Sequence, residues 1–273
     1  MGRDKKRIMY LDCGMGAAGD MMTAALLELL PAEERAGFVA ELNALGIPGV
    51  TFTAEPAVRC GVQGTHMSVK VHGEDEFDLM DGHIHSHDHD HGHESHHHES
   101  SHVHGSMHSI EHILEHAAVS EKIRADVMAV YAVIADAESR VHGVPVSEIH
   151  FHEVGTLDAV ADVTAVCMLM ERTGADLITA SPVNTGSGTV RCAHGVLPVP
   201  APATALILEG IPNYKGEIKS ELCTPTGAAL LKYFVSDFGD MPEMKIAAEG
   251  HGMGSKDFEK AANCMRALLG ETE

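Results

Sequence analysis

A histidine-rich tract divides this chain and limits how it can fold. Between His83 and His104 the sequence holds eleven histidines, interleaved with aspartate, glutamate and serine, and no lysine or arginine occurs from Val71 to Glu121. The tract has almost nothing apolar to bury, so we expect a disordered insert that adds little to a core. The fold must be built from the flanking segments. We therefore divide the chain into an N-terminal part of the core (1–80), the insert (81–108) and the remainder of the core (109–273).

The first segment begins with a strand, a glycine-rich turn and a helix. Residues 8–12 are expected to form a short buried strand, Gly14–Gly19 the turn, and 21–30 the helix. Such a turn sets Asp12 at the carboxyl end of the strand and leaves backbone N–H groups at a helix N-terminus, where an anion can bind. The turn has the glycine spacing of a dinucleotide site. That alternative is weak, because no ribose-binding acid follows a second parallel strand.

The other segments alternate between helical and strand-like patterns. Helices are predicted at 32–45, 109–116, 122–142, 158–171, 203–209 and 228–234, and strands at 50–58, 64–71, 176–180, 245–248 and 264–268. Within 122–142 a buried stripe is predicted, formed by Ile123, Val127, Val130, Ile134 and Val141. The strands 50–58 and 64–71 are expected to pair as a hairpin. These elements predict an α/β fold, with a mixed sheet and flanking helices, interrupted by the insert.

The segment 149–158 carries the densest group of reactive side chains. In an extended stretch His150 and His152 point the same way. Two neutral imidazoles can hold a borderline transition metal such as nickel, zinc, copper or iron, and the carboxylates Glu153 and Asp158 can complete or orient the site. Alternatively, one histidine is structural and the glutamate only caps the following helix.

Further metal ligands are expected in the tract and in the last third of the chain. The tract ligands alternate along the sequence: His85, His87, His89, His91 and His93. Many neutral donors beside carboxylates favour metal binding over a passive low-complexity segment. Cys192 and His194 form a second candidate pair, for a soft metal or for proton transfer.

Two other motifs have both a structural and a functional interpretation. His112 and His116 have the i, i+4 spacing that could clamp a metal on one helical face, but such a pair is more often a solvated face beside glutamates, and we prefer that interpretation. Thr224, Thr226 and Gly227 precede a helix. The threonines either cap it, or their hydroxyls and the free N–H groups hold phosphate or carboxylate.

Composition narrows the classes of partner. Nineteen basic against forty acidic residues give a net charge of −21, which argues against nucleic acid and favours cations. The six cysteines are widely separated and form no C-x-x-C pair, so most should be reduced. The sequence has no signal-type apolar region and no apolar run long enough to span a membrane. We therefore expect a cytoplasmic protein.

Several blocks of sequence resemble one known family. The blocks are Leu11-Asp12-Cys13 with Gly19-Asp20-Met21, the segments 150–155, 186–188, 190–195 and 197–204, and Leu222 to Leu230. In this order, over nearly the whole chain, they resemble the nickel insertase family LarC. The resemblance implies insertion of nickel into pyridinium-3,5-bisthiocarboxylic acid mononucleotide, with nickel–sulfur and nickel–carbon bonds formed and CTP consumed. The product is the nickel-pincer cofactor of lactate racemase.

This chemistry needs nickel ligands and a base, and the candidate residues can supply both. Forming a metal–carbon bond requires loss of the ring proton, so a base and an electrophilic nickel must meet at one carbon. We expect the two histidines of 149–158 to hold nickel and the acids of that segment to orient them or take the proton. Cys13 or Cys192 could supply a transient thiolate. Asp12 and Asp20 are further catalytic candidates.

The chain departs from the family pattern in two places. It ends at Glu273, whereas the family's CTP site, with its magnesium or manganese ion, lies beyond such a segment. We therefore expect CTP to act through a separate C-terminal insertase part, and apo lactate racemase to receive the product. The small residues of Gly14–Gly19 also replace a bulkier pattern, which predicts a different pocket shape.

Two other classes of function remain open from the sequence. One is a nickel storage or delivery protein that performs no bond chemistry. The other is a metal-dependent hydrolase or nucleotide enzyme that would use Asp12, Asp20 and Asp158 with a hard cation.

Overall fold

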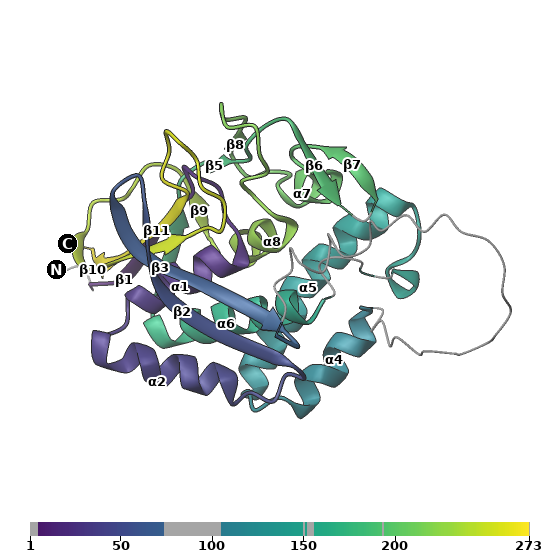
Figure 1. Cartoon of the computed structure of the whole chain (residues 1–273), viewed down its shortest axis with the longest axis horizontal. Helices are drawn as coiled ribbons and strands as arrows, with labels where there is room; N and C mark the ends of the chain where they lie inside the picture. Colours follow the sequence, from purple (N-terminus) through teal and green to yellow (C-terminus); the bar gives the residue numbers. More distant parts are fainter. Residues whose placement is uncertain (1–4, 74–104, 150, 152–155, 193, 273) are drawn as a thin grey trace, which may run out of the picture.

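A mixed seven-stranded sheet forms the centre of the computed structural model, which describes residues 5–73, 105–149, 151, 156–192 and 194–272 (Figure 1). The strand order is β2-β3-β10-β11-β1-β4-β9. The strands are β1 (Arg7–Asp12), β2 (Val50–Arg59), β3 (Val62–Val71), β4 (Leu177–Ala180), β9 (Asp237–Phe238), β10 (Lys245–Met253) and β11 (Cys264–Glu271). Two short pairs lie outside this sheet: β5 (Val183–Asn184) with β8 (Asn213–Tyr214), and β6 (Thr189–Cys192) with β7 (Gly195–Pro198).

The sheet joins segments from both sides of the histidine-rich tract. β2 and β3 form the predicted antiparallel hairpin, and β3 meets β10 at Thr65 and Gly252. At the centre, β1 runs parallel to β4 and antiparallel to β11. The predicted α/β class with a mixed sheet is confirmed. The tract itself, where we expected disorder, lies outside the described residues.

The helices cover the sheet in layers. They are α1 (Gly19–Glu28), α2 (Ala32–Asn43), α4 (Met107–His116), α5 (Glu121–His142), α6 (Leu157–Thr173), α7 (Pro202–Ile207) and α8 (Pro225–Phe234), with a 3-10 turn at Val146–Glu148. α1 lies between the sheet and α6, and α5 packs against α6, α7 and α8 (Figure 1). A helix enclosed on two sides must be apolar around most of its circumference, which explains why residues 21–27 of α1 are all buried.

The close approach of α1 to the sheet depends on two glycines of β10, Gly250 and Gly252. Gly252 of β10 faces the backbone of α1, and a Cβ at this position would overlap the carbonyl oxygen of Met21. Only glycine lets the helix and strand backbones approach this closely.

The predicted stripe on α5 is largely, but not wholly, buried. Ile123, Val127, Val130 and Ile134 are buried, as expected from their helical spacing. The prediction that Val141 belongs to the buried stripe is wrong, since this residue is 38% exposed. It lies in the last turn of α5, next to the left-handed Gly143 that ends the helix, where the buried face of the helix has already ended.

All six cysteines are free, as their spacing predicted. Among the described residues, no helix is both long and apolar enough to cross a membrane.

Candidate functional site

Asp12 lies at the carboxyl end of β1 and makes two polar contacts. Its Oδ1 accepts a hydrogen bond from the Gly14 N–H at 3.1 Å, and its Oδ2 lies 3.0 Å from Nη2 of Arg266 on the neighbouring strand. The Arg266 side chain is 42% exposed and that of Asp12 34%, so water still reaches the pair. Asp12 therefore shapes the turn after β1, and a catalytic role for it stays a prediction.

Cys13 is the residue before this turn and is fully buried. Its backbone N–H donates to Oγ of Ser181 at 2.8 Å, which ties β1 to the loop after β4. Burial, with smaller contributions from Cys223 and Asp12, raises the pKa of the Cys13 thiol well above its usual value. Burial also raises the pKa of Cys223 to about 12. The fold thus favours the neutral thiols, and the thiolate role predicted for Cys13 would require this region to open.

The turn after β1 rests on the start of α8. Thr224 donates its N–H to the Ala17 carbonyl oxygen at 3.0 Å, and its Oγ1 accepts from the Gly227 N–H at 3.1 Å. Thr224 therefore caps α8, which is the structural alternative that the sequence left open. Thr226 is buried in the first turn of the same helix. Binding of phosphate or carboxylate by these residues stays a prediction.

Asp20 occupies the first turn of α1 and is half-buried. Burial raises the pKa of its carboxyl, although the backbone N–H groups of the helix start and the nearby charges of His66 and Lys256 oppose the rise. His66 is held by its Nδ1, which lies 2.9 Å from the Met253 carbonyl oxygen. A carboxyl group with a raised pKa at the start of a helix is a chemically useful base.

A second carboxylate, that of Asp162, lies against the glycine that precedes Asp20. A Cβ on Gly19 would be 2.8 Å from Oδ2 of Asp162 on α6, so the absence of a side chain at Gly19 is what brings α1 and this carboxylate together. Asp158, one turn earlier on α6, and Asp162 both raise the pKa of Tyr131, after burial as the first cause. α5 and α6 therefore bring Asp158 and Asp162 close to the buried Tyr131, and α1 meets this group through Gly19.

This carboxylate cluster (Asp158, Asp162 and Tyr131) extends to the segment that carried the strongest metal motif. The Phe151 ring is buried, 5.9 Å from the Tyr131 ring. The Phe151 N–H donates to the Gly105 carbonyl oxygen at 2.6 Å, where the chain leaves the histidine-rich tract. Gly105, which follows the tract, Phe151 in the 149–158 segment and the carboxylate cluster thus lie side by side.

Several predicted ligands fall outside the described residues. These are His150, His152 and Glu153, and the tract residues His85, His87, His89, His91 and His93. Within the part of the chain that the structure describes, no group of three or more His, Cys, Asp or Glu side chains has the arrangement of a metal site. The metal site predicted from 149–158 therefore stays a prediction.

The structure places Cys192 and His194 elsewhere. Both lie on the β6–β7 hairpin, where the exposed His194 ring is 5.0 Å from the ring of His142, the last residue of α5. His142 follows Tyr131 by eleven residues on the same helix, which corresponds to roughly 16 Å along its axis. The fold does not bring this pair together with the carboxylate cluster.

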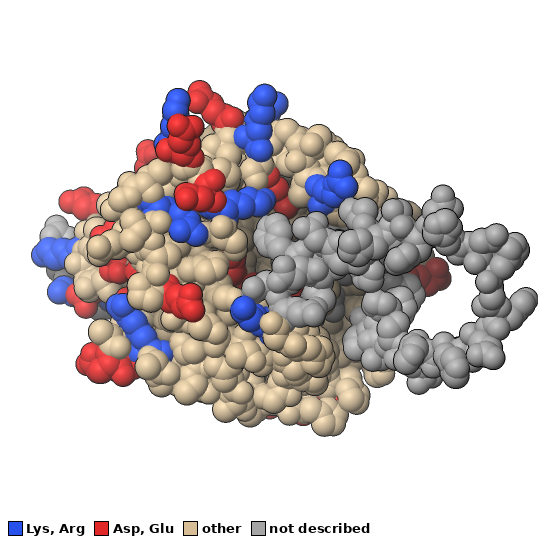
Figure 2. All heavy atoms as spheres, in the orientation of Figure 1, with Lys and Arg blue, Asp and Glu red and all other residues tan. Residues whose placement is uncertain are grey.

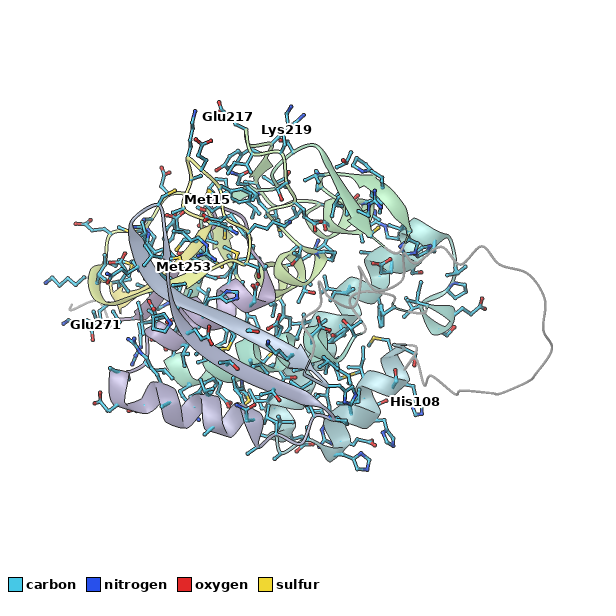
Figure 3. All side chains as sticks on the ribbon, viewed as in Figure 1. Met15, His108, Glu217, Lys219, Met253 and Glu271 are labelled. Carbon is cyan, nitrogen blue, oxygen red and sulfur yellow. The ribbon has the colours of Figure 1, made fainter. Side chains whose placement is uncertain are left out.

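Basic side chains surround the turn after β1, although the chain is strongly acidic. Lys256 reaches Oγ of Ser220 at 3.0 Å, and Arg59 reaches the Gly254 carbonyl oxygen at 3.2 Å. Figure 2 shows lysines and arginines interspersed with acids across this face, and Figure 3 marks the region by Met15 and Met253. With Arg266, these cations make the surroundings of Asp12 and Asp20 suitable for an anionic ligand.

Sequence reasoning did not select four residues that the fold brings to this region: Tyr131, Asp162, His66 and Lys256. Asp162 had a local signal, since it shares a helical face with Asp158. The others come from distant elements, and their proximity depends on the tertiary fold.

Comparison with known proteins shows which family this architecture represents. A family model described as "Nickel insertion protein" matches residues 9–273. The chain belongs to the nickel insertion protein family. A pyridinium-3,5-bisthiocarboxylic acid mononucleotide nickel insertion protein of Geobacillus kaustophilus is 35% identical over 97% of this chain and 60% of its own length. A protein of the same name from Staphylococcus epidermidis is 33% identical over 98% of this chain and 60% of its own length. The chain thus spans about 60% of these relatives, corresponding to their N-terminal part. No solved structure matches it significantly.

Proposed function

We propose that this chain carries out the metal-binding and proton-removing steps of nickel insertion into pyridinium-3,5-bisthiocarboxylic acid mononucleotide. The names of the two relatives give the reaction. The observation that carries the proposal is the carboxylate cluster, which lies against Gly19, the residue before Asp20, and meets the 149–158 segment at Phe151.

Nickel is a substrate in this proposal. His150 and His152 would hold it as neutral imidazoles, and Asp158 or Glu153 would orient them or join the coordination. Asp158 lies in the first turn of α6. The bridge between Gly105 and Phe151 supports delivery of nickel from the histidine-rich tract, because it ties the end of the tract to this segment.

We assign removal of the ring proton to Asp20. A general base works best when its pKa lies near the operating pH, and burial moves the pKa of Asp20 upward from that of an ordinary carboxyl. Asp162 and Tyr131 would position this end of the substrate. Glu153 and Asp158 are the alternative bases.

The basic residues give the same region affinity for the other end of the substrate. A mononucleotide with two thiocarboxylates is strongly anionic, and Lys256 and Arg266 lie near Asp20 and Asp12, on either side of the turn after β1. CTP with magnesium or manganese would act through a C-terminal insertase part, and apo lactate racemase would receive the product.

Activation of apo lactate racemase tests the proposal. The chain is incubated with nickel, the bisthiocarboxylate nucleotide, CTP and magnesium or manganese, with and without the C-terminal part of the Geobacillus kaustophilus relative. We expect activation that depends on both CTP and this chain. Activation by nickel in the absence of CTP would instead indicate a storage or delivery protein.

A further inference from the structure

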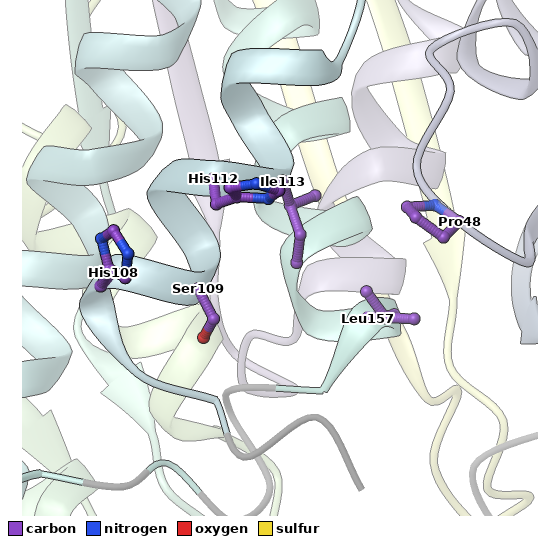
Figure 4. Close-up of a pocket in the computed structure, with 6 residues that line it drawn as sticks. All are labelled: Pro48, His108, Ser109, His112, Ile113 and Leu157. Carbon is purple, nitrogen blue, oxygen red and sulfur yellow. The ribbon is translucent and has the colours of Figure 1, made fainter. Parts of the chain in front are cut away.

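α4 carries two exposed histidines on the rim of a hollow. His108 and His112 are one helical turn apart, and both line a hollow of about 370 Å³ together with Pro48, Ser109, Ile113 and Leu157 (Figure 4). The sequence had suggested only the next pair along the helix, His112 and His116, and had favoured a solvated face for it. The hollow was not visible from the helical spacing.

The spacing and surroundings of the two side chains suit a metal. Side chains at i and i+4 have Cβ atoms roughly 5–6 Å apart, and two imidazoles in this arrangement can grip one cation, as they do in helical zinc sites. Neutral imidazole is a good ligand for nickel, copper and zinc. The walls formed by Pro48, Ile113 and Leu157 are apolar, so the polar side chains that line the hollow are the two histidines and Ser109. Glu111 and Glu115 on the same helix add negative charge nearby.

The pair lies between two regions linked to nickel by the proposed function. α4 begins just after Gly105, the residue that ends the tract and hydrogen bonds with Phe151. Leu157, in the wall of the hollow, is the first residue of α6, immediately before Asp158. His108 is well separated from Met15 in Figure 3, so the pair does not belong to the turn after β1.

We propose that His108 and His112 form a two-imidazole binding site for a borderline divalent transition metal on α4, separate from the histidine-rich tract. Water completes the coordination. The site receives metal at the point where the tract joins the folded body. Metal binding here does not require the insertion reaction, so it can be tested even if the proposed function is wrong.

His116 offers an internal comparison. Its ring stacks on that of His112 at 4.5 Å between centroids, and its Nδ1 lies 2.8 Å from the His112 carbonyl oxygen. That contact occupies one of its two ring nitrogens, and His116 does not line the hollow. His116→Gln is therefore a matched control at the same spacing on the same helix.

Methyl NMR with nickel as the probe tests the site directly. The background is the full chain with the eleven tract histidines, His150 and His152 changed to asparagine, which removes the other histidines proposed to bind nickel. Paramagnetic nickel should broaden the methyl signals of Ile113 and Leu157 at low molar ratio. His108→Gln and His112→Gln should each abolish this broadening and weaken nickel binding at the site by more than about tenfold, since loss of a first ligand exceeds the effect of losing a supporting partner.

The His116→Gln variant is the control for this experiment. His116→Gln should retain the broadening, and all three variants should melt within a degree or two of the parent, because the side chains are exposed. Unchanged broadening in His108→Gln would overturn the site. Loss of the broadening in His116→Gln would move the metal to the other pair and equally contradict the proposal.

Discussion

The ionised carboxyl of Asp20 lowers the stability of the fold, but its raised pKa suits a general base. Because its carboxyl has a raised pKa in the fold, the folded chain binds this proton more tightly than the unfolded chain, whose value is near 3.8. Its contribution to stability is therefore present at low pH and is lost as the pH rises through the folded pKa. A residue that is desolvated at a helix start and destabilising when ionised is more useful to catalysis than to folding.

Asp20→Asn should separate these two effects. We expect nickel insertion to fall by about 100-fold or more, as is typical for loss of a general base. The melting temperature at pH 8 should stay the same or rise, because the amide need not be ionised. Melting and insertion are measured on the same preparation, with the exposed Glu243→Gln as control. A large loss of stability at pH 8 would show that Asp20 is structural.

The reactivity of the cysteine thiols gives a second test at single residues. Cys13 and Cys223 are fully buried with raised pKa values, whereas Cys60 is exposed. Alkylation at pH 8 followed by peptide mass mapping should modify Cys60 rapidly and leave Cys13 and Cys223 protected until the protein unfolds. Labelling of Cys13 as fast as Cys60 in the native protein would restore the thiolate hypothesis in its simple form.

Contact between α1 and β10 is the element-scale feature on which the site depends, since α1 carries Asp20. Gly252→Ala should force the helix away from the sheet and destabilise the protein by about 1–3 kcal/mol, as overpacking does. Gly37→Ala on exposed α2 has free space around it and should stabilise by about 0.5–1 kcal/mol. Urea unfolding of both variants checks the opposite signs. Equal effects would contradict the tight packing of α1.

Helices and strands could be predicted where the sequence signal is local. The candidate site could not, because its residues come from distant parts of the chain. The 3.6-residue period located α5, and two strand-like stretches separated by a short turn located the β2–β3 hairpin, because each signal lies within one stretch of sequence. Convergence of Gly19 with Asp162, and of Gly105 with Phe151, depends on contacts between residues far apart in the chain. Periodicity contains no information about such pairs. The error at Val141 has the same origin, since a helix keeps its period beyond the end of the core that covers it.

At the scale of the whole molecule, the core is formed from both sides of the tract. Strands from both flanking segments share one sheet, and the described residues already enclose that core. Deleting 83–104 should therefore leave the metal-free melting temperature nearly unchanged and lower the number of nickel ions bound. Calorimetry and equilibrium dialysis measure the two quantities. A large fall in melting temperature without metal would mean that the tract supports the fold.

The most direct test of nickel insertion is a single-turnover experiment on the tract-deleted chain. The chain is mixed with one equivalent of nickel, the bisthiocarboxylate nucleotide, CTP, manganese and the C-terminal part of the Geobacillus kaustophilus relative, and the nucleotide is analysed by mass spectrometry. The full-length relative serves as the positive control. We predict nickel bound to the nucleotide with loss of its ring proton, and no conversion by Asp20→Asn in the same background. A tract-deleted chain that binds nickel but never converts the nucleotide, while the relative does, would contradict the account.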